Sequence, residues 1–96
     1  MGGQENWLVA LDCLHLYRLH GRVVLGRSSD CTIRVVDPHI SRRHCELRSE
    51  AGRCRVLDLG ARNGVYVNGV RVYEHFLENG DLLCVGLHRF CFKRIG

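Results

Sequence analysis

The chain reads Val65-Tyr66-Val67-Asn68-Gly69-Val70-Arg71-Val72 at the point that decides its fold class. An Asn-Gly pair between two β-branched runs is the strongest short-range signal for a β-hairpin, because both residues tolerate the positive φ of a two-residue turn. Further short β-type runs lie on both sides, with turn residues about every eight to twelve positions. No long stretch shows the 3.6-residue period of a helix. The sequence therefore predicts an all-β sandwich or barrel.

Alternation of apolar and charged residues within these runs indicates one inward and one outward face. The runs predict strands at residues 7–12, 14–19, 22–25, 32–36, 44–48, 53–57, 65–67, 70–72, 82–85 and 89–93. The predicted core is built on three alternating pairs, which are Ile33 and Val35, Cys45 and Leu47, and Cys54 and Val56. Pro38 fixes the entry to a loop because it lacks a backbone donor.

Length and composition limit the chain to one domain. Its 96 residues leave no room for a second domain, and 46% hydrophobic and 25% charged residues are typical of globular proteins. No stretch approaches the ~20 apolar residues needed to cross a bilayer, so no membrane contact is expected. Residues 1–6 lack the apolar run of a signal peptide and are predicted to form a disordered leader before a domain at 7–96.

The six cysteines are expected to be free thiols. Their spacings repeat nothing, and no signal peptide indicates the oxidising environment that maintains disulfides. Zinc bound with some of the six histidines is the alternative, but no C-x-x-C pair or Cys-His doublet of ligand spacing occurs. We therefore predict no metal and no cofactor, and a reducing compartment inside the cell.

The excess of basic residues lies in one region. Residues 22–62 hold nine Arg and five acidic residues, a surplus of four that equals the net charge of the chain. Thirteen of the fourteen basic residues are Arg, whose planar set of donors matches a phosphate bidentately. The composition favours an anionic partner, although a surface Arg is most often only solvated.

Three short motifs occur where the loops of a sandwich meet at one end, and they are Gly26-Arg27-Ser28, Ser41-Arg42-Arg43-His44 and Asn63-Gly64. The guanidinium of Arg27 can pair with a phosphate, and the hydroxyl of Ser41 can donate to one of its oxygens. The carboxamide of Asn63 both donates and accepts, so it can hold the backbone of a bound peptide. Each motif alone is also an ordinary turn; together they predict a phosphopeptide clamp.

In this order and spacing the motifs resemble the forkhead-associated (FHA) domain. The matching blocks are residues 25–28, 37–44, 58–64, 67–69, 77–81 and 85–86, and the resemblance runs over about residues 7–93. It implies an FHA-like β-sandwich of about eleven strands, a module of protein-protein interaction and signalling. Such a module binds phosphothreonine in another protein through loops at one end. Preference for phosphothreonine over phosphoserine rests on the resemblance alone.

The resemblance also implies roles for the matched residues. Three would bind the phosphate, and they are Arg27, Ser41 and Arg42. Three would support the site, and they are Gly26, His44 and Gly64. Asn63 would bind the peptide backbone, while His39 and Arg62 would contact residues that flank the phosphothreonine. Ala61 and Val65 depart from the family pattern, which leaves the flanking preference undetermined.

Two alternative functions stay open. Some members of the family use the fold for phosphate-independent self-association, but Arg27, Ser41 and Asn63 are intact here, and no homo-oligomer is predicted. A basic nucleic-acid-binding β-barrel is the weaker alternative, because the seven aromatic residues do not cluster with the Arg-rich loops. No enzyme is predicted, since neither a nucleophile elbow nor a G-x-x-x-x-G-K-[ST] loop occurs.

Location is inferred from the thiols and from the resemblance. Free thiols indicate an intracellular protein. The family is common in DNA-damage and cell-cycle signalling, so the nucleus is expected ahead of the cytoplasm.

Overall fold

The computed structural model describes residues 3–96, and every regular element in this range is a β-strand. The eleven strands are β1 Glu5–Ala10, β2 His15–Leu19, β3 Arg22–Gly26, β4 Ile33–Arg34, β5 Cys45–Glu50, β6 Arg53–Asp58, β7 Val65–Val67, β8 Val70–Val72, β9 Glu74–Leu77, β10 Leu82–Val85 and β11 His88–Ile95. Between residues 3 and 96 there is no helix long and apolar enough to cross a membrane. The all-β prediction and the expected number of strands are confirmed.

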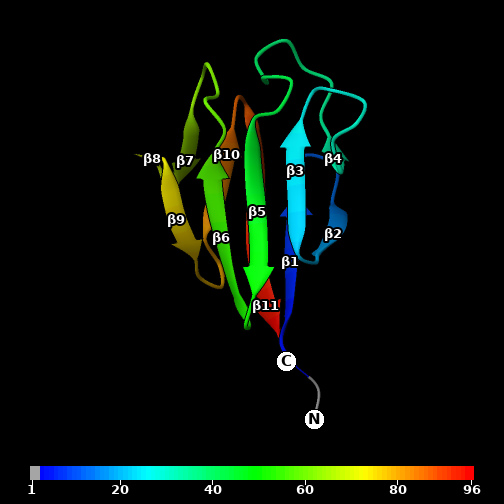
Figure 1. The fold of residues 1–96 in the computed structure, drawn as a ribbon, viewed down its shortest axis with the longest axis vertical. Coiled ribbons are helices and arrows are strands. Elements are labelled where there is room, and N and C mark those ends of the chain that lie inside the picture. Colours follow the sequence, from blue (N-terminus) through cyan, green and yellow to red (C-terminus); the bar gives the residue numbers. More distant parts are fainter. Residues whose placement is uncertain (1–2) are drawn as a thin grey trace.

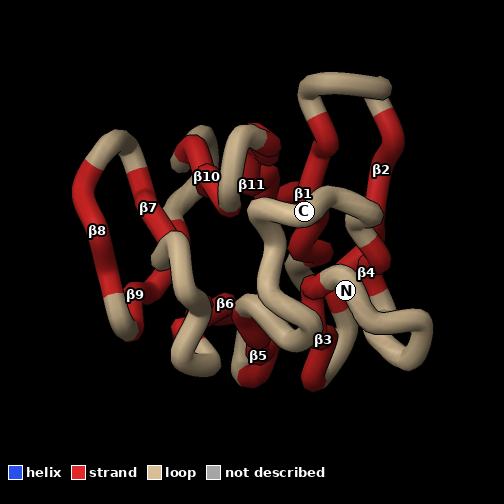
Figure 2. Tube along the Cα trace, turned by 90° about the horizontal axis from the view of Figure 1, so that it is seen from above, coloured by secondary structure: helices blue, strands red, loops and turns tan. Residues whose placement is uncertain are grey.

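The strands form two sheets that pack face to face (Figure 1). One sheet has six strands in the order β2-β1-β11-β10-β7-β8, and the other has five in the order β4-β3-β5-β6-β9. Figure 2 looks along the long axis and shows β10, β11, β1 and β2 in one layer, with β6, β5, β3 and β4 in the other. The predicted sandwich is therefore confirmed.

The core lies between the sheets and is built from the inward side chains of alternating strands. Phe92 of β11, Leu8 of β1 and Leu47 of β5 are fully buried. Each such side chain contributes roughly 1.5–3 kcal/mol by leaving water. Five of the six predicted core residues are buried; the exception is Val35, which lies past the end of β4 and is half-buried against the core.

The hairpin predicted at residues 65–72 is present. β7 and β8 pair through Asn68 and Gly69, whose φ angles are 52° and 83°. Asn68 also ties the hairpin to β10, because its Oδ1 accepts the Leu82 N–H at 2.9 Å. Its Nδ2 donates to Asp81 at 3.0 Å. The turn thus joins three strands rather than two.

Most strands differ from the prediction by one or two residues at an end, and β9 and β4 differ in other ways. β9 is absent from the predicted strands, because Glu74–Leu77 carries no β-branched residue and only its pairing with β6 makes it a strand. β4 covers Ile33–Arg34 instead of residues 32–36. Its partner β3 ends at Gly26, opposite Arg34, so the ladder cannot continue.

The predicted leader over residues 1–6 is wrong at Glu5 and Asn6, which begin β1. Glu5 pairs with Ile95 and Asn6 with Arg94, so their backbone groups are satisfied by the last strand of the chain. A partner so distant in sequence leaves no local signal. Residues 1–2 lie outside the described residues.

Three loops meet at the upper end of the sandwich in Figure 1, where β3 ends and β5 and β7 begin. Backbone hydrogen bonds join two of them, because the Arg27 N–H donates to the Ser41 carbonyl and the Ser28 N–H to the Arg42 carbonyl, each at 3.0 Å. The chains approach so closely that a Cβ on Gly26 would lie 2.1 Å from the Arg42 oxygen. Only glycine fits there.

Asp37 fixes the entry to the loop that precedes β5. Its Oδ1 accepts the His39 backbone N–H at 2.7 Å, and its Oδ2 lies 2.8 Å from Nε2 of His88 in β11. The second ring nitrogen of His88 lies 3.1 Å from Asp12 Oδ2. The pKa of Asp37 falls from its usual 3.8 to about 2, first through the His39 backbone bond and then through His88. The loop is thereby tied to the six-stranded sheet.

Gly26→Ala is expected to destabilise the protein by about 1–3 kcal/mol, because the new methyl group meets backbone atoms that cannot give way. Urea unfolding measures the free energy difference. Gly3→Ala is the matched control, since a Cβ there meets nothing within 4 Å. Equal stability of the Gly26 and Gly3 variants would contradict the close approach.

Asp37→Asn is expected to weaken the dependence of the free energy of unfolding on pH at acid pH. Because the folded protein lowers the pKa of Asp37, its carboxylate stabilises the fold above pH 3.8, and this contribution is lost as the pH falls toward about 2. The stability difference between wild type and variant therefore shrinks between those two values, in unfolding measured at each pH. Glu78→Gln, which changes an exposed carboxylate, is the control. A difference that does not change with pH counts against the assignment.

Candidate functional site

The three predicted anchors lie in the loops at the end of the sandwich where β3 ends and β5 and β7 begin. Arg27 follows β3, Ser41 precedes β5, and Asn63 lies in the loop between β6 and β7. All three line one hollow of about 120 Å³. The same hollow is lined by four further residues, which are Pro38, His39, Ile40 and Arg62. Loops from both halves of the chain thus build a single concave site.

The guanidinium of Arg27 has donors to spare. Its Nε donates to the Ile40 carbonyl at 3.0 Å, which holds the side chain against the loop. Within residues 3–96 Arg27 forms no ion pair, although other Arg side chains of the protein do. Its two terminal amino groups therefore remain for an anion.

The hydroxyl of Ser41 is oriented by its neighbour in the next loop. The backbone N–H of Arg62 donates to Ser41 Oγ at 3.1 Å. Since the oxygen acts as an acceptor in this bond, its own proton is free to be donated. Ser41 can therefore give a hydrogen bond to an anion in the hollow.

Asn63 links two loops and keeps one polar atom free. Its Nδ2 donates to the His39 carbonyl at 2.8 Å, which fixes the carboxamide across the hollow. Among residues 3–96 no group donates to its Oδ1. That oxygen is available to accept a backbone N–H of a bound peptide.

His44 is a buried structural residue. The Ser41 backbone N–H donates to its Nδ1 at 3.1 Å, and its Nε2 lies 2.7 Å from the Gly64 carbonyl oxygen. Since Nδ1 accepts, the proton of the neutral ring is on Nε2, which donates to Gly64. The ring is fully buried and sits behind the hollow, where it joins the loop of Ser41 to the loop of Asn63.

The other two arginines of the motif lie apart from the hollow. The side chain of Arg43 donates to Asp30 at 3.1 Å. The side chain of Arg42 is exposed and does not line the hollow, while its carbonyl accepts bonds from Ser28 N–H and Cys31 Sγ. Within residues 3–96 the side chain of Arg42 forms no ion pair, whereas that of Arg43 is paired with Asp30.

Several groups that shape the site were not assigned by the sequence. The Ile40 carbonyl holds Arg27, and Asp37 fixes the loop entry. Asp58 Oδ1 accepts the backbone N–H groups of Gly60 and Ala61 at 2.9 and 2.7 Å, which bends the chain toward Asn63. The spacing of Asp58 and Gly60, like that of Asp37 and His39, is a usual Asx-turn signal and can be read from the sequence, whereas the contact of Arg27 with the Ile40 carbonyl cannot.

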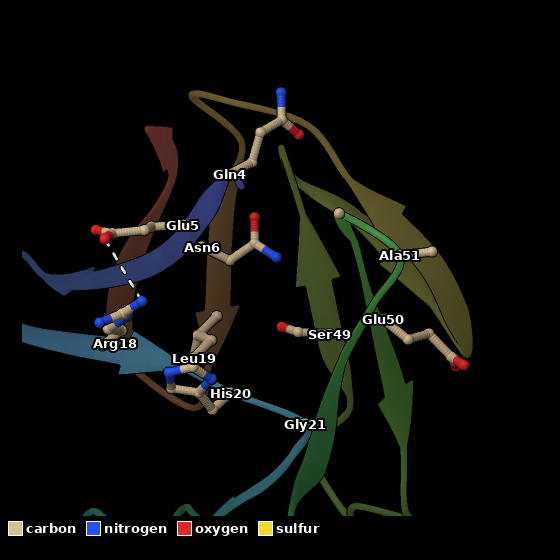
Figure 3. A pocket seen from close by; sticks show the side chains of 11 residues that line it. Gln4, Glu5, Asn6, Arg18, Leu19, His20, Gly21, Ser49, Glu50 and Ala51 are labelled. Atoms are coloured by element: carbon tan, nitrogen blue, oxygen red, sulfur yellow. Dashed lines mark ion pairs between the residues drawn. The ribbon is translucent and has the colours of Figure 1, made fainter. Parts of the chain in front are cut away.

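A different hollow, of about 170 Å³, lies at the opposite end of the sandwich. Figure 3 shows Asn6 of β1 and Ser49 of β5 pointing into it from the two sheets. The arginine at its edge, Arg18, is already paired with Glu5 at 3.4 Å. This hollow therefore offers no spare cation, unlike the hollow at Arg27. Residues 3–96 also contain no cluster of side chains suited to a metal ion.

Comparison with known proteins identifies relatives of this chain. The FHA domain family matches residues 23–86. The glycogen accumulation regulator GarA of Mycolicibacterium smegmatis is 43% identical over 67 residues, which cover 70% of this chain and 42% of GarA. The oxoglutarate dehydrogenase inhibitor of Corynebacterium jeikeium is 39% identical over 67 residues, which cover 70% of this chain and 46% of that protein. The chain spans less than half the length of these curated relatives.

Solved structures share the whole sandwich. One, from a structural and functional analysis of phosphothreonine-dependent FHA domain interactions, has a TM-score of 0.90 at 31% identity and covers 93% of this chain and 95% of its own. The FHA domain of FhaA, complexed with the intracellular domain of Rv3910, has a TM-score of 0.88 at 31% identity. That match covers 92% of this chain and 99% of the FhaA domain.

These relatives correct one expectation and settle the family. GarA, FhaA and the oxoglutarate dehydrogenase inhibitors come from bacteria, which have no nucleus. The expected nuclear location is therefore wrong, and these relatives give no support to a role in DNA damage. From the match over residues 23–86 and the shared sandwich, we conclude that this chain belongs to the FHA domain family.

Proposed function

We propose that this chain is a phosphoprotein-binding module that takes a phosphothreonine segment of a partner protein into the hollow lined by Arg27, Ser41 and Asn63. One observation carries the proposal. A guanidinium, a hydroxyl and a carboxamide from three loops face one hollow, and each keeps a polar group without a partner in residues 3–96. The spare donors belong to the guanidinium of Arg27 and the hydroxyl of Ser41, and such donors together with a positive charge favour the binding of an anion.

Some residues of the site would bind the phosphate, and others would bind the peptide around it. A phosphothreonine carries about −1.5 to −2 charges and three acceptor oxygens, which match the guanidinium of Arg27 and the hydroxyl of Ser41. Arg42, next to Ser41 in the chain, has a long exposed side chain and would add a second cation. Asn63 Oδ1 would accept a peptide N–H beside the phosphate. His39 and Arg62 line the hollow and would face the flanking residues.

Binding rather than catalysis fits the relatives. GarA is named a regulator, and the corynebacterial relatives are named inhibitors of oxoglutarate dehydrogenase. EmbR of Mycobacterium tuberculosis, which shares the fold with a TM-score of 0.89 at 25% identity, has been solved with a low-affinity phosphopeptide. We infer that this chain likewise acts in signalling by holding a phosphorylated protein, without a reaction or a cofactor of its own.

Titration calorimetry tests the proposal with four probes. They are a phosphothreonine peptide library, its unphosphorylated twin, its phosphoserine twin, and a single-stranded oligonucleotide at two salt concentrations. Binding of the first alone is expected, and sedimentation should show a monomer. Tighter binding of the oligonucleotide, or dimerisation without any peptide binding, would replace the proposed function by one of the two alternatives.

Arg27→Ala is expected to lower the affinity for the phosphothreonine peptide by at least ~2 kcal/mol, or roughly thirtyfold, because a charged hydrogen-bonded pair is lost. Calorimetry with wild type and variant measures the loss. Arg42→Ala should lose less, since its exposed side chain does not line the hollow. Arg43→Ala is the matched control, because its guanidinium is held by Asp30. An equal loss in the Arg27 and Arg43 variants would refute the assignment.

Asn63→Ala is expected to weaken the same peptide by about 1 kcal/mol, the usual contribution of a neutral hydrogen bond. Because Asn63 carries no charge, the salt dependence of binding should stay that of the wild type. Arg27→Ala should reduce that salt dependence. Affinities at three ionic strengths separate the two effects, and a change of slope in the Asn63 variant would show that the residue acts on charge.

A further inference from the structure

The outward side of the six-stranded sheet is apolar where a solvent-facing sheet would be polar. Val9 of β1 lies opposite Leu16 on one side and Cys91 on the other, and Cys91 lies opposite Leu82 of β10. Four adjacent strands thus place four apolar side chains in one row. Leu16 is 59% exposed, and the other three are half-buried. We call the outward side of the six-stranded sheet, which holds this row, the outer apolar face.

The outer apolar face extends beyond this row in both directions along the strands. Trp7 lies two positions before Val9 on β1, and Cys84 lies two positions after Leu82 on β10. Cys84 pairs with Tyr66 of β7, which is 36% exposed. Burial raises the pKa of the Cys84 thiol, so this side chain stays uncharged. Contiguous exposed apolar area of this kind marks interaction surfaces.

The outward side of the five-stranded sheet, by comparison, carries ion pairs. Glu46 of β5 forms ion pairs with Arg22 and with Arg48. Arg55 of β6 forms another with Glu74. Three arginines on this side thus share two glutamates, so carboxylates accompany these cations.

The charge left without an ion pair on and around the outer apolar face is positive. The cations of this face are Arg18, Arg71, Arg89 and Lys93. Among residues 3–96 the face holds one carboxylate, Glu5, which lies 3.4 Å from Arg18 and is paired with it. The other three cations form no ion pair within residues 3–96. A complementary surface must therefore bring apolar side chains together with carboxylates.

We propose that the outer apolar face is a second docking surface, which binds an acidic and apolar segment or surface of a partner protein. A second copy of this chain does not fit, because stacking two such faces would bring unpaired cations together without carboxylates between them. The face lies on the outer side of the six-stranded sheet, whereas the hollow at Arg27 is lined by loops at one end of the sandwich. The proposal goes beyond the proposed function and does not depend on it.

Nuclear magnetic resonance of the full chain with defined probes tests this surface. One probe is an 18-residue amphipathic helical peptide with Leu on one side and Glu on the other; its twin carries Lys in place of Glu. We expect the Glu peptide to bind at least about tenfold more tightly than the Lys peptide. The shifted resonances should gather at Val9, Leu16 and Cys91.

Two variants test the two components of the surface. Leu16→Asn removes the most exposed apolar side chain of the row, and Lys93→Glu reverses an unpaired charge; each should weaken the Glu peptide at least about fivefold. Phe76→Asn, on the five-stranded sheet and 44% exposed, is the matched control and should leave binding unchanged. Phosphothreonine-peptide affinity should be that of the wild type in all three variants. That result separates failure here from failure of the proposed function.

Four results would overturn the proposal. The first is equal binding of both peptides. The second is a set of shifts centred on Arg27 and Ser41, which would mean that the carboxylates occupy the phosphate hollow. The third is a dimer whose interface shifts lie on the outer apolar face. The fourth is binding to phosphatidylglycerol vesicles with no binding of either peptide, which would assign the face to a membrane surface.

Discussion

The buried imidazole of His44 is the contact on which the binding site depends. It accepts the Ser41 N–H through Nδ1 and donates to the Gly64 carbonyl through Nε2, so one ring sets the separation of two loops. Both contacts need the neutral ring, because a second proton would turn Nδ1 from an acceptor into a donor. A side chain held in this way, with no exposure to water, positions Ser41 and Asn63 before any ligand arrives.

The arginines of this chain differ in the partners that the fold gives them. Arg22 and Arg48 flank Glu46, and Arg43 is paired with Asp30, so these cations are neutralised locally. Arg27 contacts only a carbonyl, which orients the guanidinium without cancelling its charge. On the outer apolar face Arg71, Arg89 and Lys93 form no ion pair within residues 3–96, while Arg22, Arg48 and Arg55 on the other sheet are paired. The proposed binding surfaces rest on this difference.

Local chemistry explains which parts of the fold were readable from the sequence. The Asn68-Gly69 turn, the alternation in β5 and β6, and the loop entry at Pro38 all depend on neighbouring residues. β9 and the first two residues of β1 were missed, because each is held by a strand distant in the chain. For the same reason the sequence pointed to Arg27 but not to the Ile40 carbonyl that holds it. The prediction of a nuclear location was wrong because it was taken from the family as a whole and not from residues of this chain.

The sequence by itself determined the β-sandwich, the chemical identity of the three anchors and the family, since turn residues and short motifs act over a few positions. Only the tertiary structure decided which donors are left without a partner in residues 3–96 and that Arg42 and Arg43 differ in their partners. It also decided that one sheet presents an apolar, cationic side to solvent. Each of these depends on contacts between strands and loops that meet only after folding. Pairing across such distances is set by the packing of the two sheets and is not encoded in any one segment.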